Sequence, residues 1–214
     1  MSLRPMLIKS VEFAGAIGAP GGKHPPGALP QVAFSGRSNV GKSSLINTLL
    51  GRTRSKVARV SATPGKTREV NFYRVRAGTG AGDDVEFFLV DLPGYGYARV
   101  PVALRGAWQP LIEGYLGTSR HVRGVVQLLD IRRGPTPDDR RMLAYLATLG
   151  TPTVFVLTKA DKLGRAERAR QVERITRELG ADAEQVVPVS TLSGEGRDEL
   201  LDALEGLIVD GGES

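Results

Sequence analysis

Residues 32–44 read Val32-Ala33-Phe34-Ser35-Gly36-Arg37-Ser38-Asn39-Val40-Gly41-Lys42-Ser43-Ser44. A short apolar run leads into a Gly-x-x-x-x-Gly-Lys-Ser pattern and then into a helical pattern over residues 42–50. Gly36 and Gly41 let backbone N–H groups approach a phosphate without a Cβ in the way, and the helix N-terminus adds partial positive charge. The stretch therefore predicts a strand, a phosphate-binding loop and a helix.

The same alternation of apolar runs and helical patterns continues along the chain. It predicts strands at 32–35, 70–75, 85–90, 125–129, 153–157 and 186–189, and helices at 42–50, 104–116, 136–149, 165–179 and 195–208. Such a rhythm is typical of a mostly parallel sheet with helices on both faces. The Gly and Asp residues of 77–84 favour a hairpin, so one edge strand should be antiparallel. We expect an α/β fold of three layers around a sheet of six strands.

The composition sets the boundaries and excludes several classes of protein. Residues 15–30 are rich in Gly and Pro, which predicts an N-terminal extension over 1–30, one domain over 31–209 and a short tail over 210–214. The absence of cysteine excludes a disulfide scaffold and a thiolate metal site. No apolar run approaches the roughly 18 residues that a membrane span needs. The first ten residues are too interrupted for a signal peptide, so we expect a cytoplasmic protein without a membrane partner.

The positive charge is unevenly distributed. The net charge is +6, but the first 194 residues hold 28 basic and 16 acidic side chains because the end of the chain is acidic. Residues 52–68 hold six basic side chains and no acidic one. A basic surface suits a polyanionic partner but also occurs in proteins with neutral partners, so the location of the charge is more informative than its sum.

Polar residues follow several of the predicted strands, where ligands of open α/β sheets bind. Lys42 would place a point charge on the β- and γ-phosphates of a nucleotide, and Ser43 would offer its hydroxyl to Mg²⁺. Asp91-Leu92-Pro93-Gly94 follows the strand at 85–90. A buried carboxylate needs a cation nearby, such as Mg²⁺, and Gly94 would turn its N–H toward a γ-phosphate. An ordinary β-turn also produces this four-residue pattern.

The next strand ends carry residues suited to a guanine base. Thr158-Lys159-Ala160-Asp161 follows the strand at 153–157, and Ser190-Thr191-Leu192 follows the strand at 186–189. A carboxylate accepts two parallel hydrogen bonds from the N1–H and the amine of guanine, whereas adenine presents an acceptor at N1. Asp161 therefore predicts selection of GTP over ATP. The stem of Lys159 would lie along the base, and the second triplet would bring a backbone N–H to the guanine oxygen.

A long basic segment separates the phosphate-binding loop from the strand at 70–75. It contains Thr63-Pro64-Gly65-Lys66-Thr67 and reads either as a solvated loop or as a loop that orders on ligand binding. A threonine that completes the Mg²⁺ shell only when a γ-phosphate is present would make the segment a switch.

These motifs give the chain a resemblance to a known family. Residues 34–47, 63–73 and 91–98, the last ending in Pro93-Gly94-Tyr95-Gly96-Tyr97-Ala98, resemble the EngB/YihA/YsxC family of bacterial ribosome-biogenesis GTPases, which are translation-factor-class P-loop GTPases. The resemblance implies the P-loop GTPase fold. It implies catalysis by Lys42, Thr67 and Gly94, and Mg²⁺ held by Ser43, Thr67 and, through water, Asp91. It implies GTP or GDP binding by Gly36, Arg37, Ser38, Asn39, Val40, Gly41, Lys42, Ser43, Ser44, Gly65, Lys66, Thr67, Asp91, Leu92, Pro93, Gly94, Thr158, Lys159, Asp161, Ser190, Thr191 and Leu192.

Two positions bear on the rate of hydrolysis. Tyr95 stands where Ras-type GTPases place a glutamine that orients the attacking water, so the resemblance implies slow hydrolysis by the protein alone. Asn39 matches the loop asparagine of potassium-activated relatives, in which K⁺ stabilises the transition state. Its other role is to shape the loop.

The sequence therefore predicts a monomeric, GTP-controlled switch with bound Mg²⁺. The resemblance implies docking on a precursor of the large ribosomal subunit, without DNA, and a need for the protein in cell division. Residues 52–68, Arg132 and Arg133 would contact rRNA phosphates, or part of this cluster would instead contact nucleotide phosphates or water. A small-molecule kinase that uses ATP would leave Asp161 unexplained. A nucleotide-independent RNA-binding protein would carry more stacking residues than the 6% aromatic content found.

Overall fold

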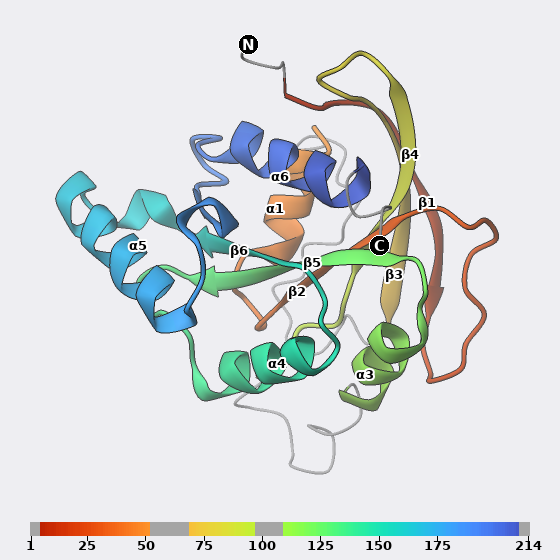
Figure 1. The fold of residues 1–214 in the computed structure, drawn as a ribbon, viewed down its shortest axis with the longest axis horizontal. Coiled ribbons are helices and arrows are strands. Elements are labelled where there is room, and N and C mark those ends of the chain that lie inside the picture. The colour runs from red at the N-terminus through yellow and green to blue at the C-terminus, as the bar shows by residue number, and fades with distance from the viewer. Residues whose placement is uncertain (1–4, 52–68, 97–108, 210–214) are drawn as a thin grey trace.

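The computed structural model describes residues 5–51, 69–96 and 109–209 (Figure 1). In these ranges one sheet has the strand order β1-β3-β4-β2-β5-β6-β7. The strands are β1 (Leu7–Ile17), β2 (Gln31–Gly36), β3 (Val70–Gly78), β4 (Asp84–Asp91), β5 (Val122–Asp130), β6 (Thr153–Thr158) and β7 (Val186–Val189). The α-helices are α1 (Lys42–Leu49), α3 (Gln109–Thr118), α4 (Pro137–Thr148), α5 (Arg165–Leu179) and α6 (Arg197–Val209), and short 3₁₀ turns are η1 (Ala160–Lys162) and η2 (Ala183–Gln185).

The sheet confirms the predicted α/β class and corrects its edge. β3 pairs antiparallel with both β1 and β4, while the pairs from β4 to β7 are parallel. Among the described strands β3 therefore runs against the other six, as the hairpin predicted. The expected count of six strands was wrong, because β1 adds a seventh strand outside β3.

The missed strand β1 has a physical explanation. Its register with β3 shifts between Ile8 and Ser10 and again between Phe13 and Gly15. Each shift breaks the alternation of inward and outward side chains on which a sequence-based strand prediction depends. The sheet therefore begins at Leu7, ahead of the boundary drawn at residue 31, and residues 18–30 connect β1 to β2.

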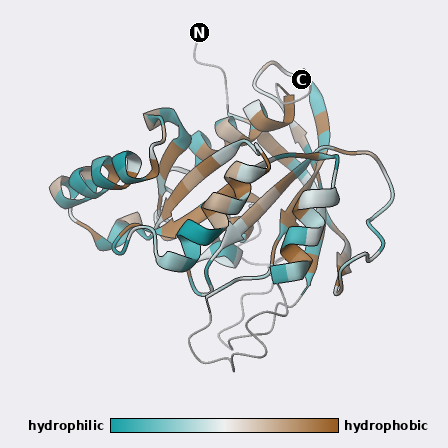
Figure 2. Ribbon diagram, turned by 60° about the horizontal axis from the view of Figure 1, so that its bottom comes forward, coloured by the Kyte–Doolittle hydropathy of each residue, from teal (hydrophilic) through white to brown (hydrophobic). Residues whose placement is uncertain are grey.

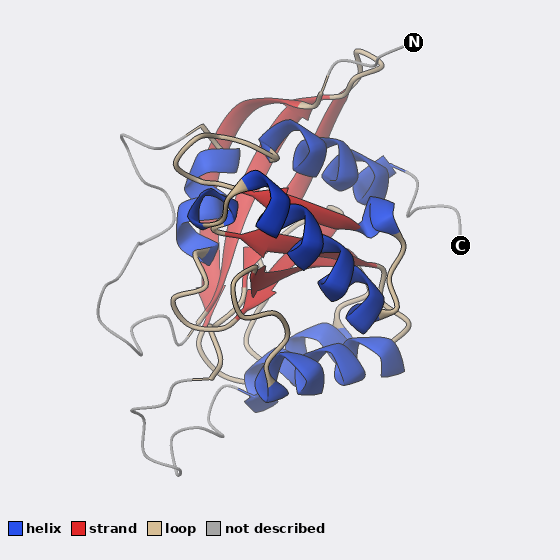
Figure 3. Cartoon of the chain, turned by 90° about the vertical axis from the view of Figure 1, so that its left-hand side faces the viewer, coloured by secondary structure: helices blue, strands red, loops and turns tan. Residues whose placement is uncertain are grey.

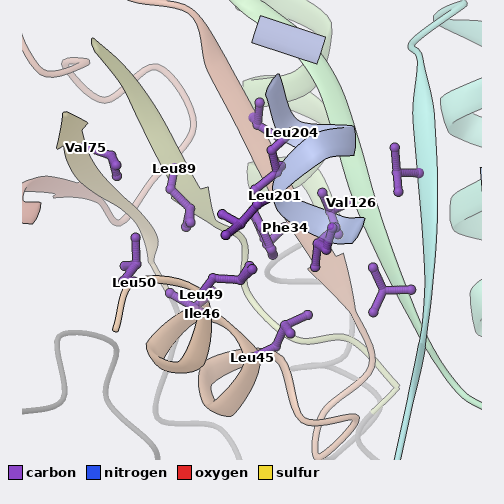
Figure 4. Packing of buried hydrophobic residues seen from close by; sticks show 14 of the residues in the cluster. Phe34, Leu45, Ile46, Leu49, Leu50, Val75, Leu89, Val126, Leu201 and Leu204 are labelled. Carbon is purple, nitrogen blue, oxygen red and sulfur yellow. The ribbon is translucent and has the colours of Figure 1, made fainter. Parts of the chain in front are cut away.

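Helices cover both faces of the sheet (Figures 1 and 3). On one face α1 and α6 pack against the sheet; Figure 4 shows Leu45, Ile46 and Leu49 of α1 near Phe34 of β2 and Leu201 of α6. Burying each such side chain contributes about 1.5–3 kcal/mol. On the other face two clusters take in α3, α4 and α5. Figure 2 shows hydrophobic central strands and a largely hydrophilic α5 at the outside.

The start of α4 is fixed by a capping box. The Thr136 hydroxyl accepts a hydrogen bond from the Asp139 backbone N–H at 3.4 Å, and the Asp139 carboxylate accepts one from the Thr136 backbone N–H at 2.9 Å. Pro137 at the first helical position suits this start, because its missing N–H needs no partner there. Asp139 is only 2% exposed, so its carboxylate is held at a defined place beneath the surface.

The topology gathers the motifs at one edge. β2, β4, β5, β6 and β7 run in the same direction, so their carboxyl ends meet where ligands of open α/β sheets bind. Among the described helices, none has the length and apolar character needed to cross a membrane.

Candidate functional site

The phosphate-binding loop joins β2 to α1. Its backbone adopts positive φ at Asn39 (64°) and at Gly41 (108°), directly before α1 begins at Lys42. A Cβ on Gly36 would lie 3.0 Å from Val40 Cγ1 and 3.1 Å from Leu128 Cβ. Gly36 is therefore required by close packing against the loop and β5, whereas Gly41 is required by its backbone conformation.

Lys42 and Asp91 form an ion pair at the centre of the site. The Lys42 ammonium donates to Asp91 Oδ1, and the two residues are only 8% and 3% exposed. The buried carboxylate thus has the cationic partner that its burial demands. The sequence predicted Mg²⁺ as the cation beside Asp91. It did not predict the ion pair with Lys42.

The residues present fit Mg²⁺ bound together with a nucleotide. Ser43, the residue after Lys42, offers a hydroxyl and Asp91 a carboxylate, which are hard oxygen donors. No group of three or more His, Cys, Asp or Glu side chains placed to hold a metal occurs in the described part of the chain. In nucleotide sites Mg²⁺ is held by one or two protein oxygens together with phosphate oxygens and water, and Ser43 and Asp91 would supply such oxygens.

The segment after β4 runs along the phosphate-binding loop. The backbone N–H of Leu92 donates to Phe34 O at 3.1 Å, and the N–H of Tyr95 donates to Gly36 O at 3.4 Å. In the reverse direction, the backbone N–H and the hydroxyl of Ser38 donate to Tyr95 O at 2.9 and 3.1 Å. Parallel pairing with β2 therefore extends beyond Asp91 into the loop.

Gly94 lies directly on the loop. A Cβ at this position would lie 3.1 Å from Ser38 Oγ and 3.3 Å from Ser38 N, tighter than most side chains allow. The glycine thus permits the close approach of the two segments that the predicted γ-phosphate contact requires.

Thr158 and Lys159 tie the end of β6 to the same loop. The Thr158 hydroxyl, in a residue 2% exposed, donates to Val40 O at 2.7 Å and also lies 3.1 Å from Leu129 O. The Lys159 ammonium donates to Asn39 O at 3.0 Å and to Asp130 Oδ2 at 2.9 Å. Thr158 consequently holds the loop at Val40, and the Lys159 side chain extends from the end of β6 to the loop at Asn39.

Asp161 is held as an ionised acceptor. Ser190 Oγ donates to Asp161 Oδ1 at 3.0 Å and accepts hydrogen bonds from the backbone N–H groups of Leu192 and Ser193, each at 3.2 Å. Burial opposes ionisation, but the hydrogen bonds from Ser190 and Lys162 outweigh it and lower the pKa of Asp161. The carboxylate can therefore accept two hydrogen bonds from a guanine edge.

Asp130, at the end of β5, was missed as a site residue. Its carboxylate accepts from Arg132 Nε at 2.9 Å and Arg132 Nη2 at 2.7 Å, as well as from Lys159. Burial raises its pKa, but the hydrogen bonds from Arg132 and Lys159 outweigh burial and leave the pKa well below the ordinary value. Its position was the available signal, because Asp130 ends a strand between those that end at the phosphate-binding loop and at Thr158.

A chain of contacts thus brings four of the predicted motifs together. Lys42 meets Asp91, Ser38 meets Tyr95, Lys159 meets Asn39, and Asp161 meets Ser190. Leu192, at the end of the last motif, is 76% exposed. Gly65, Lys66 and Thr67 lie outside the described residues, as does the basic stretch 52–68. The contact of each residue with nucleotide or metal stays a prediction.

Two family models match the chain. The model described as 50S ribosome-binding GTPase matches residues 31–159, and the Elongation factor Tu GTP binding domain matches residues 113–210. Among curated proteins, the chain is 50% identical over 203 residues to the probable GTP-binding protein EngB of Gemmatimonas aurantiaca, covering 95% of each chain. It is 45% identical over 203 residues to that of Citrifermentans bemidjiense, covering 95% of this chain and 90% of the relative.

Solved structures agree on the fold. A crystal structure of a probable GTP-binding protein engB superposes with a TM-score of 0.65 at 22% identity, covering 84% of this chain and 99% of the other. Aquifex aeolicus Era bound to GDP.AlF4- superposes with a TM-score of 0.69 at 24% identity, covering 84% of this chain and 57% of Era. Both likenesses support the P-loop GTPase architecture.

Proposed function

This chain belongs to the EngB family of GTP-binding proteins, and on that premise we propose that its GTPase cycle controls docking on a precursor of the large ribosomal subunit. In this proposal GTP and Mg²⁺ order the segments around Thr67 and Gly94, the ordered surface binds the particle, and hydrolysis releases it. The protein acts in the cytoplasm as a monomer, and its loss impairs cell division.

One observation carries the switch. The backbone after Asp91 is hydrogen-bonded to the phosphate-binding loop itself, through Ser38 and the Tyr95 carbonyl. A γ-phosphate arriving at that loop would contact the segment that begins at Gly94, whereas GDP would not reach it. The nucleotide state is thereby coupled to the path of the chain beyond Gly94.

The ribosomal partner is supported by family and charge. The matching family model is that of 50S ribosome-binding GTPases, and the chain up to residue 194 carries 28 basic and 16 acidic side chains. The Arg132 side chain remains 41% exposed while paired with Asp130, and Arg133 is exposed. These arginines and the basic stretch 52–68 would release counterions from rRNA phosphates.

Slow hydrolysis follows from the use of Tyr95. Its buried hydroxyl donates to Asp139, so the side chain is not available to orient a water molecule at the γ-phosphate. A K⁺ ion bound at Asn39 would supply positive charge that stabilises the transition state. Asn39 is exposed and adopts φ 64° in the loop. Comparing GTP turnover in KCl and in NaCl tests this part, and equal rates would refute it.

Co-sedimentation with ribosomal particles tests the proposal. We expect the protein to sediment with large-subunit precursors in the presence of a GTP analogue, and much less with GDP or without nucleotide. Binding that ignores the nucleotide would overturn the switch. Replacing Arg132 and Arg133 by Gln should reduce the salt dependence by about two counterions, because each lost phosphate contact removes about one. Arg170→Gln with Arg177→Gln on α5 is the matched control.

A further inference from the structure

Tyr95 is buried and is held both through its side-chain hydroxyl and through its backbone carbonyl. The residue is 6% exposed, and its hydroxyl donates to Asp139 Oδ1 at 2.8 Å and accepts from Gln127 Nε2 at 2.6 Å. Its backbone carbonyl accepts both hydrogen bonds from Ser38 of the phosphate-binding loop. We infer that Tyr95 is a positioning residue, whose anchored hydroxyl fixes Gly94 at the γ-phosphate end of the site. The inference rests on the proposed GTP-controlled switch.

The anchor on Asp139 is itself rigid. The second oxygen of that carboxylate accepts from the backbone N–H of Thr136 at 2.9 Å and from the Thr136 hydroxyl at 2.6 Å. Asp139 therefore serves two elements at once, because one oxygen caps α4 and the other holds the Tyr95 hydroxyl. The Asp139 carboxylate thus connects Tyr95, the residue after Gly94, to the start of α4.

The partner on β5 argues against a purely stabilising role. Gln127 is fully buried and stands opposite Ser35 of β2 in the sheet register. Within the described residues, neither Gln127 Oε1 nor Ser35 Oγ has a hydrogen-bond partner. Buried polar groups without partners cost stability, so an apolar cluster would hold the fold better at this place. Orientation of the Tyr95 side chain by Gln127 and Asp139 would explain why this cluster is polar.

The phenol keeps its proton under all ordinary conditions. Burial, and next the charge of Asp139, raise the pKa of Tyr95 well above its ordinary value. The hydroxyl therefore stays protonated at neutral pH and can donate to Asp139.

Loss of the hydrogen bonds of the Tyr95 hydroxyl should weaken GTP binding more than GDP binding. Gly94 directly precedes Tyr95 and lies against Ser38, so we expect a shift of Tyr95 to displace the Gly94 N–H that is predicted to meet the γ-phosphate. GDP lacks that phosphate, so its predicted contacts are those with Lys42, the rest of the loop and the base-binding residue Asp161. A misplacement at the reacting end lowers the rate of the chemical step more than it lowers ground-state binding.

Tyr95→Phe removes only the hydroxyl, and the chain offers a matched control. Tyr115 is also buried, at 4% exposure, and its hydroxyl donates to Gln31 Oε1 at 2.8 Å on the α3 side of the sheet. Tyr115→Phe loses the buried hydrogen bond to Gln31, and Tyr95→Phe loses the buried hydrogen bonds to Asp139 and Gln127. The measurements are dissociation constants for a fluorescent GTP analogue and for GDP, the single-turnover rate of GTP hydrolysis, and Tm.

We expect Tyr95→Phe to lower the single-turnover hydrolysis rate by about tenfold. The affinity for the GTP analogue should fall severalfold more than the affinity for GDP. Tyr115→Phe should change neither quantity by more than about twofold. Equal behaviour of the two variants, or a change in Tm alone, would overturn the inference. If Tyr95→Phe does not fold, Gln127→Met removes the donor to the same hydroxyl and must give the same pattern. Particle binding by the wild type that ignores nucleotide would instead refute the proposed switch.

Discussion

The Lys42 ammonium is hydrogen-bonded to the Asp91 carboxylate, in a buried ion pair that joins the phosphate-binding loop to the end of β4. Each residue is also predicted to bind part of a Mg²⁺-nucleotide, Lys42 the phosphates and Asp91 the metal through water. We therefore expect the ion pair to compete with a Mg²⁺-nucleotide for these two side chains.

Asp91→Asn should separate these two effects. Without Mg²⁺, in EDTA, the freed Lys42 is expected to bind GDP about fivefold more tightly than in the wild type, because no carboxylate competes for it. With Mg²⁺, the variant should lack most of the gain in affinity that the metal gives the wild type. Fluorescence titration of GDP with and without Mg²⁺ measures both quantities.

Asp84→Asn is the matched control for this experiment. It removes another Lys–Asp pair, formed with Lys9, at the opposite end of β4 and with both side chains about half exposed. It should leave both GDP affinities unchanged. An Asp91→Asn variant that binds GDP more weakly in EDTA would contradict competition by the ion pair.

Asp130→Asn should lower stability in a pH-dependent way. The hydrogen bonds from Arg132 and Lys159 hold the pKa of Asp130 below its unfolded value of about 3.9. A lowered folded-state pKa stabilises the protein above the unfolded pKa, and this stabilisation is lost as pH falls toward the folded pKa. We expect the variant to lose about 1–2 kcal/mol of unfolding free energy at pH 7.

The pH profile checks the cause. Urea unfolding of both proteins should give a constant difference from pH 7 down to about pH 5, and a difference that narrows below about pH 4. A difference that stays the same at all pH values would show that the lost contribution comes from packing and not from ionisation.

Tyr95→Gln should not restore Ras-type hydrolysis. The Tyr95 side chain is buried, and its hydroxyl is hydrogen-bonded to Gln127 and Asp139, so we expect a glutamine here to enter the same polar cluster. The shorter glutamine would leave the polar cluster poorly filled, so the single-turnover rate should equal the wild-type rate or fall below it. A rate increase of tenfold or more would contradict this assignment of Tyr95.

Most of the site was predictable, because ligands of open α/β sheets bind at the carboxyl ends of the strands. Gly36, Asp91, Thr158 and Ser190 each end or follow a short apolar run, and parallel strands bring such ends together. The α/β class and most element bounds follow from the hydrophobic periodicity, and the antiparallel β3 follows from the Gly and Asp residues of 77–84.

The missed features depend on contacts between distant residues. β1 is concealed by two register shifts, which break its period of two. Tyr95 reaches Gln127 and Asp139, 32 and 44 residues away, and Lys42 reaches Asp91, 49 residues away. Each of these side chains has an ordinary local role as strand, cap or loop residue, so no local pattern marks the partner.

The most direct test of the account combines base recognition with particle binding. Asp161→Asn replaces an acceptor of guanine hydrogen bonds by an amide that can donate to the C2 oxygen of xanthine, and should weaken GTP by about 100-fold while favouring xanthosine triphosphate. Co-sedimentation of this variant with large-subunit precursors is then measured with analogues of each nucleotide. We expect binding with the xanthosine analogue and not with the GTP analogue. Equal binding with either one, or with neither nucleotide present, would contradict it.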